Sequence, residues 1–225
     1  MSRPSGSPAP EPARLAPAAR IAVLLSGRGS NFVALAEALA RQEAPARIVL
    51  VVSNVAAAPG LERARELGIP AAVLPHRDFP SRSAHEDALL ALLRDAGVEW
   101  ICLAGYMRLL GAEFVAEYSG RILNVHPSLL PAFPGLHPQR QALEAGVRIS
   151  GCTVHLVDGG LDSGPIVVQR AVAVEDGDDE ASLAARILDQ EHLAYPEALR
   201  RLLTERWTVE GRRLCFAGVA PGAER

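Results

Sequence analysis

The sequence holds few cysteines, and they form no recognisable pair. Cys102, Cys152 and Cys215 are far apart and show no C-x-x-C spacing. An odd, scattered set in a chain without a secretory signal fits a reducing compartment, so we expect a cytoplasmic protein. Cys102 and Cys152 lie within apolar stretches and are interpreted as small core side chains.

A basic excess and a long apolar run are lacking as well. The formal net charge is −3 at pH 7. Basic residues mostly stand beside acidic ones, as in 61–66, so no basic patch for nucleic acid is visible. No apolar run approaches the length of a membrane span. Neither nucleic acid nor a membrane is therefore expected as a partner.

What remains is the composition of a globular protein. Apolar residues make up 49% and charged residues 22% of the 225 residues, and no internal repeat is present. Residues 1–19 are rich in Pro, Ala and Ser and lack hydrophobic periodicity, which predicts a disordered N-terminal tail. Residues 215–225 are interpreted as a C-terminal tail. We therefore expect one domain over 20–214.

Apolar runs alternate with helical patterns in this domain. We expect strands at 21–25, 47–52, 71–74, 100–104 and 122–125, and helices at 31–41, 61–67, 83–96 and around 112–118. Continuous apolar strands interleaved with helices are typical of a parallel sheet covered on both faces. The sequence therefore predicts an α/β fold with a single Rossmann-like, mostly parallel central sheet.

The rhythm changes after about residue 148. Strands expected at 149–157 and 166–174 have no helix between them, so we expect antiparallel or mixed pairing in the C-terminal part of the sheet. A long amphipathic helix is expected over 179–203, after an acidic turn that favours the positive end of a helix.

The loop after the first strand, Ser26-Gly27-Arg28-Gly29-Ser30-Asn31, runs directly into a helix. Its glycines let backbone N–H groups turn towards a ligand, and the helix N-terminus adds about half a positive charge, which indicates an anion site. The alternative is a tight turn with Ser30 as N-cap. Phe32 replaces the third glycine of the dinucleotide fingerprint, and the second strand ends in Ser53-Asn54 without an acidic residue. A phosphomonoester fits better than a dinucleotide.

Two polar segments farther along are candidates for chemistry. Asn124 and His126 stand two apart at a strand end, so both side chains project to one face. The carboxyl ends of strands are where open α/β sheets place ligands. Asp158 and Asp162 lie in a glycine-rich loop, which is either a simple turn or a means of delivering a carboxylate into a cleft.

These segments occur in an order that resembles a known family. The matching motifs are Ser26-Gly-x-Gly-Ser-Asn31, Leu103-Ala-Gly-Tyr-Met107, Asn124-x-His126-Pro-Ser-Leu-Leu-Pro131, Leu161-Asp162-x-Gly-Pro165 and Gln190-Glu191-His192. Together they resemble the phosphoribosylglycinamide formyltransferases, folate-dependent enzymes of purine synthesis, over roughly 20–214. Two departures are Arg28, at a loop position often occupied by Asn in relatives, and Ala132, where a polar residue is common.

The resemblance implies transfer of a formyl group from 10-formyltetrahydrofolate, as co-substrate, to the amine of glycinamide ribonucleotide, by a monomer or homodimer. The site residues that it implies fall into three groups: catalytic Asn124, His126 and Asp162; substrate-binding Gly29, Ser30, Asn31 and Glu191; and folate-binding Arg82, Met107, Arg108, Leu109 and Leu110.

The residue types suit that reaction. As the amine attacks the formyl carbon, negative charge develops on the formyl oxygen, and the Asn124 amide and a protonated His126 could both hydrogen-bond it. A nearby Asp162 would favour charged His126 and could position a water for proton transfer. No metal is expected, because His126, His137 and His155 have no recognised zinc spacing. No Ser or Cys nucleophile has a plausible partner, so direct transfer is expected.

Other functions stay open at this point. A methionyl-tRNA formyltransferase is expected to carry a further C-terminal domain, and a formyltetrahydrofolate hydrolase an N-terminal regulatory domain. A sugar-nucleotide formyltransferase is not expected to match the first loop. A non-catalytic protein that binds a phosphate ligand would use that loop but leave Asn124, His126 and Asp162 without a role.

Overall fold

The computed structural model describes residues 18–217, so nearly all of the expected N-terminal tail, and residues 218–225 of the expected C-terminal tail, lie outside it. The strands are β1 (Ala19–Leu25), β2 (Ala46–Ser53), β3 (Ala71–Val73), β4 (Trp100–Leu103), β5 (Ile122–His126), β6 (Ile149–Leu156), β7 (Ile166–Ala173), β8 (Trp207–Glu210) and β9 (Arg213–Phe216). The helices are α1 (Ser30–Ala40), α2 (Pro59–Glu66), α3 (Arg82–Asp95), α4 (Ala112–Glu117), α5 (Pro138–Glu144) and α6 (Glu180–Thr204), with a 3-10 turn η1 (His76–Asp78).

All of the strands belong to one sheet, in the order β3-β2-β1-β4-β5-β6-β7-β9-β8. The pairs among β1 to β5 are parallel, whereas β6 runs antiparallel to both β5 and β7. The prediction of a mostly parallel α/β sheet with a mixed C-terminal part is confirmed. The order reverses between β1 and β4, which opens a crevice at the carboxyl ends of these two strands.

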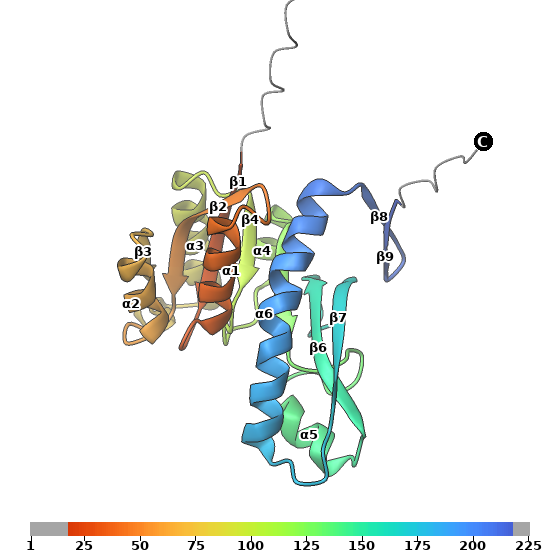
Figure 1. Cartoon of the computed structure of the whole chain (residues 1–225). Coiled ribbons are helices and arrows are strands. Elements are labelled where there is room, and N and C mark those ends of the chain that lie inside the picture. Colours follow the sequence, from red (N-terminus) through yellow and green to blue (C-terminus); the bar gives the residue numbers. More distant parts are fainter. Residues whose placement is uncertain (1–17, 218–225) are drawn as a thin grey trace, which may run out of the picture.

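Helices α1 and α6 lie on one face of the sheet and α3 and α4 on the other (Figure 1), and side chains that alternate along β1 divide the core into two layers. Val23 and Leu25 pack in the cluster that includes residues of α1 and α6, while Ala22 and Leu24 pack with residues of α3 and α4. Each fully buried Val or Leu contributes about 1.5–3 kcal/mol relative to an exposed one. Helices therefore cover both faces, as predicted.

Helix α6 begins at a capping box and packs against the sheet. The Asp179 carboxylate accepts from the Ser182 backbone N–H at 2.8 Å, and the Ser182 hydroxyl oxygen accepts from the Asp179 N–H at 3.0 Å. Farther along, the Tyr195 hydroxyl lies 2.9 Å from the carbonyl oxygen of Leu103 and 3.1 Å from that of Leu123. This buried contact holds the middle of α6 against the ends of β4 and β5.

Three elements were not predicted from the sequence: η1, α5 and the hairpin β8–β9. Strand β9 continues to Phe216, so the expected boundary of the C-terminal tail at residue 215 cuts through this strand. The hairpin is held by tertiary contacts with α6, because the Arg201 guanidinium stacks on the Phe216 ring of β9 at 3.7 Å and the Trp207 indole N–H of β8 donates to the Leu202 carbonyl at 3.1 Å. None of the helices in residues 18–217 is long and apolar enough to cross a membrane.

Candidate active site

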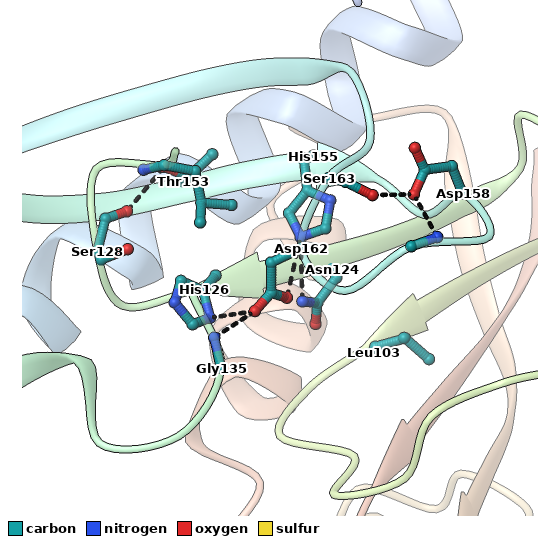
Figure 2. A network of polar contacts seen from close by, with 12 residues as sticks. Leu103, Asn124, His126, Ser128, Gly135, Thr153, His155, Asp158, Asp162 and Ser163 are labelled. Atoms are coloured by element: carbon teal, nitrogen blue, oxygen red, sulfur yellow. Dashed lines mark hydrogen bonds and ion pairs between the residues drawn. The ribbon is translucent and has the colours of Figure 1, made fainter. Parts of the chain in front are cut away.

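Asn124 and His126 lie at the carboxyl end of β5, and β6 supplies their partners. The antiparallel register places His155 opposite Asn124 and Thr153 opposite His126. Since neighbouring strands set cross-strand side chains within reach of each other, four polar groups gather on this part of the sheet. Figure 2 shows that Asp162, from the loop after β6, lies beside His126, Asn124 and His155, whereas Thr153 faces Ser128.

Asp162 joins the two strands through its two carboxylate oxygens. Oδ2 lies 3.4 Å from His126 Nδ1 and accepts from the Gly135 backbone N–H at 2.8 Å, while Oδ1 lies 3.8 Å from His155 Nε2. The side chains of His126 and Asp162 are only 7% and 11% exposed. The structure therefore brings together all three residues that the resemblance implies as catalytic.

His155 also contacts Asp162, and the sequence analysis assigned it no role in the site. Its Nδ1 lies 3.0 Å from the Leu156 carbonyl oxygen, and its Nε2 lies 3.2 Å from Asn124 Nδ2. Burial lowers the pKa of His155, so the ring is neutral near pH 7, with N–H at Nδ1 and an acceptor at Nε2. The Asn124 amide then donates one N–H to His155 and keeps its second N–H for a ligand.

The loop between β5 and α5 closes over His126. His126 Nε2 donates to the Phe133 carbonyl oxygen at 2.8 Å. The loop itself is held by Thr153, whose hydroxyl donates to the Ser128 carbonyl at 2.7 Å and accepts from the Leu130 N–H at 3.0 Å. These buried hydrogen bonds set the ring orientation of His126.

The loop after β1 has the geometry of an anion site. Gly29 is the N-cap of α1, with φ +74°, and no side chain caps the helix. A Cβ on Gly29 would stand 3.0 Å from the Gly60 Cα, so the position requires glycine for space as well as for its left-handed backbone. The alternative in which Ser30 caps the helix is wrong, because Ser30 is the first helical residue.

A hollow of about 340 Å³ lies in front of this loop, in the crevice between β1 and β4. Glu191 of α6 lines it together with Asn31, and its Oε2 accepts from Asn31 Nδ2 at 2.6 Å. Burial raises the pKa of Glu191. The side-chain oxygen of Asn31, Oδ1, is buried and has no hydrogen-bond partner in residues 18–217. Val125 and Pro127, the neighbours of His126, line the same hollow.

The implied folate residues are partly brought together. Met107 lines the hollow, and its backbone N–H donates to the Ser26 hydroxyl oxygen at 2.9 Å. Met107 and Leu109 are exposed. Leu110 packs against the part of the core that contains Ala22, Leu24 and residues of α3 and α4. Arg108 is half-buried.

Arg82, at the start of α3, is linked to the same segment through Glu86. Its Nε lies 3.7 Å from Glu86 Oε1, and that oxygen accepts from the Gly111 N–H at 2.9 Å. Gly111 directly follows Leu110, so Arg82 stands beside the end of the predicted folate segment.

Over residues 18–217, no three His, Cys, Asp or Glu side chains are grouped to hold a metal ion.

Comparisons with known proteins agree with this architecture. A family model described as formyl transferase matches residues 19–199. The chain is 55% identical over 188 residues to the trifunctional purine biosynthetic protein adenosine-3 of Drosophila pseudoobscura pseudoobscura, covering 83% of this chain and 14% of that protein. It is 43% identical over 192 residues to the phosphoribosylglycinamide formyltransferase of Escherichia coli (strain K12), covering 85% of this chain and 88% of that protein.

A solved structure gives the same result in three dimensions. Glycinamide ribonucleotide transformylase 1 from Symbiobacterium toebii superposes with a TM-score of 0.87 at 48% identity, covering 89% of this chain and 94% of that one. The chain spans only 14–20% of the length of the trifunctional relatives. The region that the family model matches, residues 19–199, is most of the chain and contains Asn124, His126, Asp162 and the loop after β1, and the chain therefore belongs to the formyl transferase family.

Proposed function

We propose that the chain transfers the formyl group of 10-formyltetrahydrofolate to the amine of glycinamide ribonucleotide. The observation that carries the proposal is that Asn124, His126 and Asp162 lie next to a hollow. This hollow is lined both by residues 26–31, here called the anion loop, and by the buried Glu191. The family match and the names of the relatives agree with it.

The phosphate of the acceptor would lie at the N-terminus of α1. The first N–H groups of this helix have no side-chain cap, and together with the helix dipole they suit an anion. Gly29, Ser30 and Asn31 are the residues proposed to bind it. Glu191, which lines the same hollow and accepts from the Asn31 amide at 2.6 Å, would accept hydrogen bonds from the amine end of the acceptor.

The transfer is proposed as a direct displacement. The amine nitrogen bonds to the formyl carbon, the bond from that carbon to N10 of the folate breaks, and the proton lost by the amine is returned to N10. The second N–H of Asn124 would stabilise the oxyanion that forms in between. This N–H is well placed because the first one is occupied by His155.

His126 and Asp162 would provide the charged part of the site. Both ring nitrogens of His126 face oxygen acceptors, the Asp162 carboxylate at 3.4 Å and the Phe133 carbonyl at 2.8 Å. A ring protonated at both nitrogens satisfies both acceptors and adds positive charge next to the oxyanion. Asp162, which is only 11% exposed, would hold that charge in place and position the water that carries the proton.

Further parts of the proposal concern the surroundings of the reaction. Arg82 and the segment formed by Met107, Arg108, Leu109 and Leu110 would bind the folate, with its carboxylates towards the arginines. The reaction as written uses the folate as co-substrate and involves no metal. We propose a cytoplasmic enzyme, acting as a monomer or homodimer.

The proposal is tested by mixing the purified chain with 10-formyltetrahydrofolate and following deformylation by absorbance, with and without glycinamide ribonucleotide. Deformylation that requires the ribonucleotide, with a formylated product of matching amount, is expected. Deformylation at the same rate without the ribonucleotide would instead identify a hydrolase. No deformylation in either case would overturn the enzymatic proposal.

A further inference from the structure

We propose that Arg28 binds the phosphate of the acceptor and sets the preference of the site for a phosphorylated acceptor. The inference rests on the proposed function and adds a residue to it. Arg28 stands in the middle of the anion loop, between Gly27 and Gly29, and lines the hollow that Asn31 and Glu191 also line.

The charge balance of the hollow calls for a cation. Among residues 18–217, Glu191 is the only acidic side chain that lines it, and Arg28 the only basic one. A phosphomonoester carries about −1.5 to −2 charges at pH 7, whereas a helix N-terminus supplies only about +0.5. The carboxylate of Glu191 further disfavours an anion in the same hollow. A guanidinium on the loop offsets that carboxylate and makes the hollow suitable for a dianion.

Arg28 is available for this role. Its side chain is exposed, and within residues 18–217 it forms no ion pair and donates no hydrogen bond. Arg63, which lines a hollow beside the same loop, is different because its Nη1 is bound to Glu66 Oε2 at 2.6 Å. An unengaged guanidinium presents several N–H donors in a planar fork that fits phosphate oxygens in pairs.

A second hollow shows where the guanidinium stands relative to the loop. This hollow, of about 660 Å³, is lined by residues of α1, α2 and α6, and Met107 and Pro127 line only the smaller one. Arg28 and Ser30 line both hollows, whereas Arg63 lines only the larger one. Arg28 therefore lies beside Ser30 at both hollows, within the loop proposed to hold the phosphate.

The expected effect is moderate, because the side chain is exposed. Replacing Arg28 by Gln removes one charge-assisted contact, so the Kd and KM for glycinamide ribonucleotide should rise about tenfold. The kcat and the folate KM should stay unchanged, since the phosphate lies away from the reacting atoms. The dependence of this KM on salt should also weaken, because one cation no longer faces the anion.

Selectivity is the property that separates this role from a general change of surface charge. The wild type should favour glycinamide ribonucleotide over the dephosphorylated glycinamide riboside. Arg28→Gln should reduce that preference about tenfold, because it weakens the binding of the phosphorylated acceptor only. Arg28→Lys should retain part of the preference, because it keeps the charge and loses the planar fork. Arg63→Gln is the matched control, with the same loss of charge on the neighbouring hollow.

The experiment measures acceptor binding by calorimetry without folate, and then the kinetics of both acceptors, for the wild type, Arg28→Gln, Arg28→Lys and Arg63→Gln. The proposal is supported if Arg28→Gln, and to a smaller extent Arg28→Lys, weakens binding of the ribonucleotide but not of the riboside, while Arg63→Gln leaves both unchanged. An unchanged Kd in Arg28→Gln, or an equal change in Arg63→Gln, would overturn it. If the wild type binds the ribonucleotide but transfers no formyl group, the proposed function fails while the result for Arg28 still stands.

Discussion

Glu191 is a buried carboxylate at a position where a neutral amide would destabilise the folded state less. The residue is 7% exposed, and the Asn31 amide donates to it at 2.6 Å. A buried carboxylate loses several kcal/mol of solvation, of which a charge-assisted hydrogen bond returns about 1.5–3 kcal/mol. In Glu191→Gln the desolvation cost is small, and a neutral hydrogen bond still contributes about 0.5–1.5 kcal/mol. The new amide also offers N–H donors near the side-chain oxygen Oδ1 of Asn31, which has no partner in residues 18–217.

We therefore expect Glu191→Gln to raise the free energy of unfolding by about 1 kcal/mol near pH 8, which raises the Tm of a domain of this size by about 2–4 °C. Burial raises the folded-state pKa of Glu191 above its value of 4.5 in the unfolded chain. Below that value both states are protonated, and the substitution gains nothing. Between that value and the folded pKa, the unfolded wild type is ionised while the folded one holds its proton, so the wild type loses stability and the gain grows. Above the folded pKa the gain stays constant.

Urea unfolding of both proteins between about pH 4 and pH 8 measures this difference directly. Glu197→Gln is the control, since Glu197 lies on the same helix, is one-third exposed and pairs with Arg170 at 2.7 Å. That change should stabilise nothing, because Arg170 loses its partner. A lower stability of Glu191→Gln at pH 8, or the same gain in both variants, would refute the reasoning. The more stable Glu191→Gln should bind the acceptor less well, with a higher KM.

Three further predictions concern the catalytic group. Asn124→Ala should lower kcat by about 10²–10³ with little change in KM, because an oxyanion donor acts mainly in the transition state; a loss confined to KM in steady-state kinetics would contradict this. His126→Ala and Asp162→Asn should each slow turnover, and because the side chains are in contact, the double variant should be far less impaired than the product of the two losses. Strictly multiplicative losses would mean that they act independently. His155→Gln should flatten the loss of stability on acidification: burial lowers the pKa of His155 below 6.5, so the unfolded chain binds a proton that the folded one disfavours, and the wild type loses stability as the pH falls below about 6.5. The free energy of unfolding, measured with urea at about pH 5.5 and 7.5, gives this loss for both proteins. An equal loss in the wild type and in His155→Gln would argue against a buried, neutral His155.

Local patterns predicted most of the fold. The apolar runs of β1 and β2, and the helical periodicity of α3, are readable because burial on both faces of a sheet, or on one face of a helix, repeats along the chain. The short helix α5 and the hairpin β8–β9 were not readable in this way. Trp207 and Phe216 are held by contacts with α6 rather than by any local pattern.

The motifs of the site were likewise visible in the sequence, since Asn124 and His126 share a strand and Asp162 lies in a glycine-rich loop. Their convergence was not visible. The β5–β6 register alone decides that His155 stands opposite Asn124, and a slip of one residue would turn the His155 side chain to the other face of the sheet. The contact of Glu191 with Asn31, 160 residues away, exists only because α6 packs across α1. The sequence by itself determined which chemical groups the protein has, and the packing of its strands and helices decided which of them meet.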